Sequence, residues 1–128
     1  MNKSVVITAA IFGVLAVITG AFGAHALKAL LSPAQLEIWN TGVQYNFYHV
    51  FALLFLSTLK VKSSWLTAAY YLFTIGIVFF SGSLYLLACR DVLHLESVVK
   101  VIGPITPLGG LLFIIGWVSL AVAAAKSK

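Results

Sequence analysis

The sequence predicts an all-α fold: an integral membrane four-helix bundle with a short interfacial helix between the first and second spans. The chain of 128 residues is 62% hydrophobic and 9% charged, with a mean hydropathy of +1.08. A soluble domain of this size cannot bury that much apolar surface. Three long runs also lack Asp, Glu, Lys and Arg, and each is long enough to cross about 30 Å of hydrocarbon.

The first span is expected at about residues 4–27 and ends in the sequence GAFGAHALK. Small residues recur along one face of this helix, which is typical of close helix packing within the chain or along a homodimer seam. The alternative is a cleaved signal peptide, because Ala24-His25-Ala26 resembles a cleavage site. The apolar run is longer than a usual signal core, so a membrane span is favoured. The packing residues predicted here are Gly13, Gly20 and Ala24.

The next segment contains a clear helix start. Ser32 stands at the N-cap, Pro33 at the first helical position and Gln35 three residues after the cap, a pattern that satisfies the free N–H groups of a first turn. Apolar residues then recur at helical spacing, which predicts a short interfacial helix leading to the second span. We expect a bend near residues 40–42 and the second span at about residues 43–59.

The third and fourth spans are expected at about residues 65–88 and 105–125. A tight turn at residues 60–64 precedes the third, and a mixed-charge connection at residues 90–103 precedes the fourth. Pro104 and Pro107 flank the start of the fourth span, where a missing backbone N–H costs least. Gly76 and Gly82 are predicted to form a second small-residue packing surface on the third span.

Charge predicts orientation rather than a nucleic-acid partner. The net charge of +5 comes from single basic residues at span ends, and nucleic-acid binding is not expected. One side of the membrane would carry five lysines and the other three basic residues, which places both termini in the cytoplasm. The five are Lys3, Lys60, Lys62, Lys126 and Lys128, and the three are Lys28, Arg90 and Lys100.

Polar residues within the spans gather in one half of the membrane under this topology, the non-cytoplasmic half. Buried polar groups are costly in a bilayer, so this layer is either a hydrogen-bond network that joins the helices or a pocket for a small ligand or partner. In the second case His25 and His49 would be its titratable members. The predicted cluster comprises His25, Gln44, Tyr45, Asn46, His49, Ser81, Ser83, Tyr85 and Thr106.

The sequence contains no strong catalytic or cofactor motif. The three histidines and three acids provide metal-ligand candidates, but no H-x-x-x-H or H-E-x-x-H pair fixes them. Cys89 lacks a second cysteine, and FSGSLY matches a nucleophile elbow only loosely. We therefore expect no catalytic residues, no metal and no cofactor, and a protein that is not an enzyme.

Four motifs in order give the chain a family resemblance. They are GAFGAHALK, the spaced set Trp39, Thr41, Val43, Tyr45 and His49, the stretch FSGSLYLL at residues 80–87, and GPITPLGG at residues 103–110 followed by Gly116-Trp117. Together they resemble the domain of unknown function 423 family, the YgdD-like small inner-membrane proteins of bacteria. The resemblance implies four membrane helices and a bacterial plasma-membrane location, and it implies no activity.

Three functional hypotheses follow. The first is a non-enzymatic multi-pass membrane protein whose polar cluster is structural or binds a small ligand or partner. The second is a small transport or proton-coupled component that uses His25 and His49, and the third is a metal-dependent membrane enzyme. The expected partners are the lipid bilayer and either a second copy of the chain or other membrane proteins.

Overall fold

The computed structural model describes residues 2–128, and over that range it contains helices and no β-strand, which confirms the all-α prediction. The long elements are α1 (Lys3–Ala24), α3 (Pro33–Thr58), α4 (Ser64–Gly76), α5 (Gly82–Ala88) and α7 (Ile105–Lys126). A π-helix, η1 (Ile77–Ser81), joins α4 to α5 in one continuous rod. Short elements make the other connections: α2 (Ala26–Leu30), the 3-10 helix η2 (Glu96–Val98) and α6 (Val99–Ile102).

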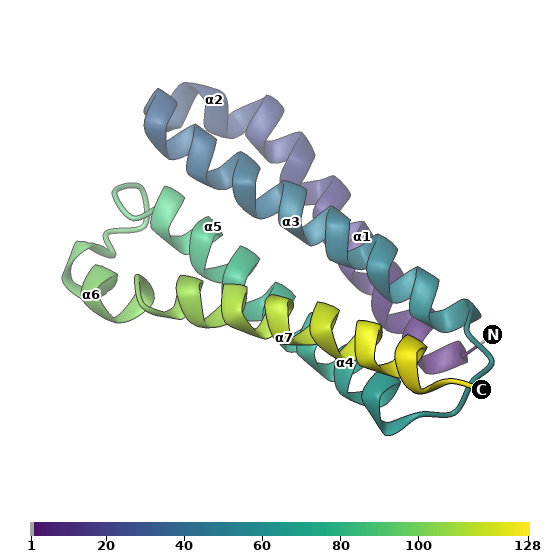
Figure 1. Cartoon of the computed structure of the whole chain (residues 1–128). Coiled ribbons are helices and arrows are strands. Elements are labelled where there is room, and N and C mark those ends of the chain that lie inside the picture. Colours follow the sequence, from purple (N-terminus) through teal and green to yellow (C-terminus); the bar gives the residue numbers. More distant parts are fainter. Residues whose placement is uncertain (1) are drawn as a thin grey trace.

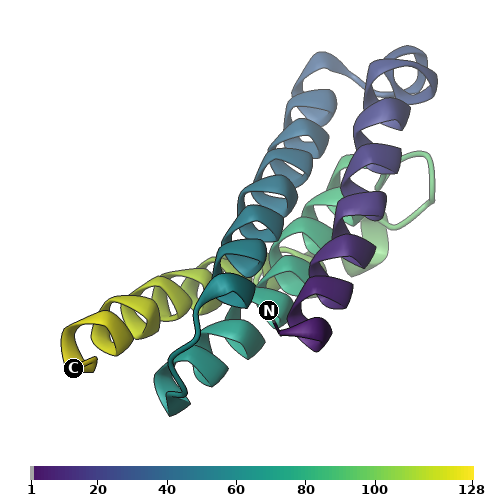
Figure 2. The same ribbon diagram turned by 90° about the vertical axis from the view of Figure 1, so that its right-hand side faces the viewer.

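The helices form two antiparallel pairs, α1 with α3 and the α4–η1–α5 rod with α7 (Figure 1). Both termini and the connection between α3 and α4 lie at one end of the molecule, while α2 and α6 lie at the other. Figure 2 shows the same two pairs from the side, and the C-terminal half of α7 diverges there from α3. The core between the pairs includes Leu53, Phe73, Ile77 and Phe113.

Three segments are long and apolar enough to cross a membrane: Lys3–Ala24, Ser64–Ala88 and Glu96–Lys126. Many of their large apolar side chains are exposed, among them Ile7, Val14 and Val17 on α1 and Ile114 and Val118 on α7. Such an apolar exterior suits contact with lipid and not with water. The α3 helix is less apolar because it carries polar residues, although its 26 residues are enough to span about 30 Å.

The predicted helix start at Ser32 is confirmed. The Ser32 hydroxyl accepts a hydrogen bond from the Gln35 amide at 3.2 Å, and the Gln35 side chain accepts one from the Ser32 amide at 3.1 Å. The residues expected to form a separate interfacial helix are instead the first turns of α3, which continues without interruption through Gly42 to Thr58. The separate short helix lies earlier, at α2, after a backbone break at His25.

Candidate functional site

His49 lies on α3, where its ring contacts Phe73 of α4 and Phe113 of α7, and its side chain is 4% exposed. Its Nδ1 lies 2.8 Å from the Tyr45 carbonyl oxygen, and its Nε2 lies 3.1 Å from Nε1 of Trp117. A carbonyl can only accept and an indole N–H can only donate, so the neutral Nδ1–H tautomer satisfies both bonds. The ring also stacks on Phe113, with 3.5 Å between centroids and 3° between planes. His49 thus has no free ring nitrogen.

A chain of hydrogen bonds links α3, α5 and α1 near the end that carries α2. The Asn46 amide donates to the Tyr85 hydroxyl at 3.1 Å, and that hydroxyl lies 3.2 Å from the hydroxyl of Thr19. Thr19 donates to the Ala16 carbonyl, so Tyr85 is the donor in its bond to Thr19. The indole N–H of Trp39 donates to the Thr19 carbonyl at 2.8 Å. One tyrosine hydroxyl therefore joins three helices.

One polar atom of this hydrogen-bond network has no hydrogen-bond partner among residues 2–128. The Oδ1 of Asn46 is buried and receives no hydrogen bond from any of residues 2–128. An unpaired buried acceptor costs about 1–3 kcal/mol. Asn46 therefore uses its amide group as a donor to Tyr85 but leaves its carbonyl oxygen unpaired.

Two serines of the FSGSLY motif, Ser81 in η1 and Ser83 in α5, form hydrogen bonds with neighbouring helices. The Ser81 hydroxyl donates to the Gly42 carbonyl on α3 at 2.7 Å and is 1% exposed. The Ser83 hydroxyl donates to the Phe80 carbonyl at 2.9 Å and lies 2.6 Å from the hydroxyl of Thr106 on α7. Thr106 is then the donor to Ser83. Both serines act as interhelical hydrogen-bond partners.

The remaining residues of the predicted cluster lie apart from these bonds. His25 is exposed at the junction of α1 and α2, and Gln44 is exposed on the outside of α3. Tyr45 contributes its backbone carbonyl to His49, while its half-exposed ring packs on Phe80. The structure thus brings Asn46 to Tyr85 and Ser83 to Thr106. Ser81 and His49 each bond elsewhere, and His25 does not meet His49.

The predicted packing residues also divide. A Cβ atom on Gly76 would lie 2.6 Å from the Phe113 ring, so this glycine allows close helix contact. A Cβ on Gly13 would lie 3.7 Å from the Val50 side chain, and one on Gly20 would lie 3.5 Å from that of Val43, which are ordinary contact distances. Ala24 is exposed, and a Cβ on Gly82 would meet no atom within 4 Å. Approaches under 3.0 Å also occur at four glycines outside that set: Gly23, Gly42, Gly109 and Gly116.

Gly109 supports the unusual backbone of η1. A Cβ there would lie 2.8 Å from Cα of Phe80 and closer still to its amide nitrogen. Since η1 is a π-helix, its wider turn brings backbone to the surface that α7 contacts. A side chain at position 109 would separate α7 from this segment.

An apolar groove lies beside His49, between α3, η1 and α7. It has a volume of about 540 Å³ and is lined by Tyr45, His49, Phe80, Phe113 and Trp117 together with residues of α7. Within residues 2–128, no three His, Cys, Asp or Glu side chains gather closely enough to hold a metal ion.

Sequence reasoning missed several residues of this site. Trp117 is the hydrogen-bond partner of His49, 68 positions away in the chain. Thr19 and Trp39 complete the network at Tyr85, and Gln35 donates to Asp91 at 2.6 Å between α3 and the loop after α5. The polarity of these residues was visible in the sequence, but their pairing depends on distant helices.

Comparison with known proteins gives one family. The sequence profile described as "Protein of unknown function (DUF423)" matches residues 19–110. The UPF0382 membrane protein YwdK of Bacillus subtilis is 43% identical over 127 residues, which cover 97% of this chain and 98% of the relative. UPF0382 membrane proteins of Staphylococcus aureus and Staphylococcus epidermidis are 41% and 42% identical over 128 residues, 97% of each chain. No solved structure matches the chain.

Proposed function

Because this chain belongs to the DUF423 family, whose relatives are named membrane proteins, we propose that it is a non-enzymatic protein of four membrane spans held together by its buried polar side chains. The observation that carries the proposal is the Tyr85 hydroxyl, which binds Asn46 of α3 and Thr19 of α1. In hydrocarbon such bonds have no competing water, so they fix which helices pack together. The polar layer is then a structural device, and the bilayer is the principal partner.

The arrangement of α3 supports a fourth span. Its polar residues Asn46 and His49 are buried against other helices, whereas Phe51 and Phe55 are 60% and 53% exposed. A helix with a polar inner face and an apolar outer face suits a bundle in lipid. With four spans, both termini lie on one side, and the excess of lysines there favours the cytoplasm of a bacterial plasma membrane.

Topology can be tested by labelling single cysteines in intact cells. In a Cys89→Ala background, Ala29→Cys and Ser97→Cys should react with a membrane-impermeant maleimide, because both positions are exposed at the α2–α6 end. Lys60→Cys and Ser127→Cys, at the opposite end, should react only after permeabilisation. Labelling of both ends from outside would contradict four spans, and the reverse pattern would contradict only the orientation.

The structural role can be tested at Tyr85. Tyr85→Phe removes the shared hydroxyl, and we expect the free energy of unfolding in detergent to fall by about 1–2 kcal/mol. Tyr48→Phe is the matched control, because Tyr48 lies on α3, is 53% exposed and makes no side-chain hydrogen bond within residues 2–128. Equal effects of the two substitutions would contradict a structural network.

Proton-coupled transport is the principal competing function, and the separation of His25 from His49 favours the structural one. Proteoliposomes loaded with a pH-sensitive dye distinguish the two. The structural proposal expects no flux beyond empty liposomes under a pH gradient, and His49→Gln should then change stability alone. A wild-type flux that His49→Gln abolishes would overturn the proposal.

Ligand binding in the groove beside His49 is a second candidate function. The groove is apolar and open to the bilayer, so its ligand would be a hydrocarbon chain that enters from the membrane. Gly110 lines the groove, and a Cβ there would lie 3.7 Å from Phe80, an ordinary contact. Gly110→Leu should fill the groove without displacing α7 and should abolish cross-linking of a photoactivatable fatty acid to residues 107–117. Unchanged cross-linking in this variant would contradict the site.

A further inference from the structure

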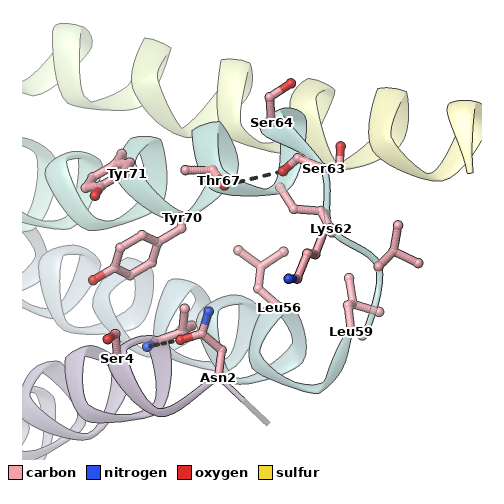
Figure 3. Close-up of a pocket in the computed structure, with 13 residues that line it drawn as sticks. Asn2, Ser4, Leu56, Leu59, Lys62, Ser63, Ser64, Thr67, Tyr70 and Tyr71 are labelled. Carbon is pink, nitrogen blue, oxygen red and sulfur yellow. Dashed lines mark hydrogen bonds between the residues drawn. The ribbon is translucent and has the colours of Figure 1, made fainter.

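A pocket of about 680 Å³ lies at the end of the molecule that carries both termini. Its walls come from the start of α1, the end of α3, the connecting loop and the first two turns of α4 (Figure 3). The backbone amide of Asn2 donates to the Ser57 carbonyl at 3.0 Å, which fixes the start of α1 to the end of α3. That bond joins two of the four wall segments, and the pocket lies outside the polar network described above.

The polar groups of the pocket are suited to an anion. Figure 3 shows the Lys62 ammonium directed into the space between α1 and α4. The Asn2 side chain uses its oxygen to accept from the Val5 amide, so its NH2 group is left to donate into the same space. Among residues 2–128, no Asp or Glu side chain lines the pocket. The three acidic residues of the chain, Glu37, Asp91 and Glu96, lie in elements at the far end.

The helices that border the pocket add to its positive potential. Both α1, with 22 residues, and α4, with 13, begin at its wall, and the start of a helix carries a partial positive charge. In α4 the Ser63 hydroxyl accepts from the Trp65 amide, which leaves other first-turn N–H groups free to donate. The hydroxyls of Ser4 and Ser64 supply further donors in the lining.

The rest of the lining is apolar, which distinguishes an amphiphile from a soluble anion. Leu56, Leu59, Val61 and Leu66 lie beside the polar groups, at the level where the helices leave the apolar spans. A phospholipid places its phosphate at this depth and its glycerol and first methylene groups next to it. The combination of one cation, several donors and an adjoining apolar wall matches that sequence of groups.

We propose that this pocket binds the phosphate of an anionic phospholipid headgroup, with Lys62 as its cationic contact and Asn2 as a hydrogen-bond donor. The site is independent of the structural function proposed above, because none of its residues takes part in the network at Tyr85. The chemistry recognised is the phosphate group, so free phosphate is the alternative source, and the experiment includes it.

The test uses the purified full chain in a non-ionic detergent. The temperature of unfolding, followed by tryptophan fluorescence, is measured against dioleoylphosphatidylglycerol, dioleoylphosphatidylcholine and sodium phosphate at constant ionic strength. We expect a saturable rise with phosphatidylglycerol and none with phosphatidylcholine, whose phosphate carries a choline cation that Lys62 and the helix starts would repel. A saturable rise with sodium phosphate of equal size would support the anion site and identify free phosphate as its source.

Lys60 provides a matched control, because it lies on the same loop, is also exposed, and does not line the pocket. Lys62→Gln should raise the half-saturating phosphatidylglycerol concentration about fivefold. Lys60→Gln should change it less than twofold, and Lys62→Arg should retain wild-type binding. Equal losses in Lys60→Gln and Lys62→Gln would show diffuse surface attraction and overturn the proposal, as would the absence of any response to phosphatidylglycerol.

Discussion

The indole N–H of Trp117 donates to Nε2 of His49 at 3.1 Å, and this bond fixes the histidine as the neutral Nδ1–H tautomer. The opposite nitrogen lies against the Tyr45 carbonyl, one turn earlier in α3. Protonation of Nε2 would remove the lone pair that Trp117 uses and place a charge inside the bundle. His49 therefore acts here as a hydrogen-bonded connection between α3 and α7.

The first prediction concerns the strength of this bond. Trp117→Phe keeps an aromatic ring and deletes the donor, which leaves Nε2 of His49 as a buried acceptor without a partner. The free energy of unfolding in detergent should therefore fall by about 1–3 kcal/mol. Trp65→Phe is the control, because the Trp65 indole N–H makes no hydrogen bond within residues 2–128. If both variants lose equal stability, the bond contributes nothing.

The second prediction concerns the tautomer itself. Nitrogen-15 NMR of the detergent-solubilised protein should show His49 as a neutral ring that is protonated at Nδ1. Trp117→Phe should leave the proton on Nδ1, because the Tyr45 carbonyl still requires a donor. A wild-type spectrum of the Nε2–H tautomer would rule out the arrangement described here.

The third prediction contrasts two adjacent glycines of α7. Gly109→Ala should lower the free energy of unfolding by about 1–3 kcal/mol, because the methyl group would press on the backbone at Phe80. Gly110→Ala has room for its methyl group and should be neutral or stabilise the helix by up to about 1 kcal/mol. Chemical denaturation of both variants provides the comparison, and tolerance of Gly109→Ala would mean that α7 does not contact η1 this closely.

The fourth prediction concerns Cys89, which follows α5 and is buried. Burial raises the pKa of the Cys89 thiol, so a smaller fraction is thiolate near pH 7.5 than for an exposed cysteine. In detergent, Cys89 should react with maleimide several times more slowly than Ser127→Cys in a Cys89→Ala background. The reaction rate of Cys89 should continue to rise at pH values where the rate of the exposed cysteine has levelled off. Equal rates for the two cysteines at pH 7.5 would contradict the burial of Cys89.

Much of the fold could be predicted because its determinants are local. The apolar composition indicated a helical membrane protein, and the Ser32-Pro33 pair and Gln35 set the start of α3. The extent of α3 was less predictable. Residues 40–42 suggested a bend, yet Gly42 is buried within a continuous helix, where a Cβ would lie 2.9 Å from the ring of Tyr85. That contact comes from α5, so the residues next to Gly42 in the sequence do not reveal it.

The site was less predictable, because its bonds join residues that are far apart in sequence. Asn46 and Tyr85 are 39 positions apart, and His49 and Trp117 are 68 apart. Spacing along one helix can show which residues share a face but not which residue of another helix lies opposite. Gly109 and Gly110 illustrate the same limit, since only the position of Phe80 distinguishes them.

The π-helix η1 sets how α5 is rotated relative to α4 within the α4–η1–α5 rod. A π-turn accommodates one residue more than an α-turn, so every residue after it is rotated by about 100° relative to an uninterrupted α-helix. Ser83 and Tyr85 follow this step and face their partners on α7, α1 and α3. Loss of a single residue from Ile77–Ser81 would turn both hydroxyls away from these partners together. The length of η1 thus determines the orientation of Ser83 and Tyr85 together, so a deletion in η1 would disrupt both sets of hydrogen bonds at once.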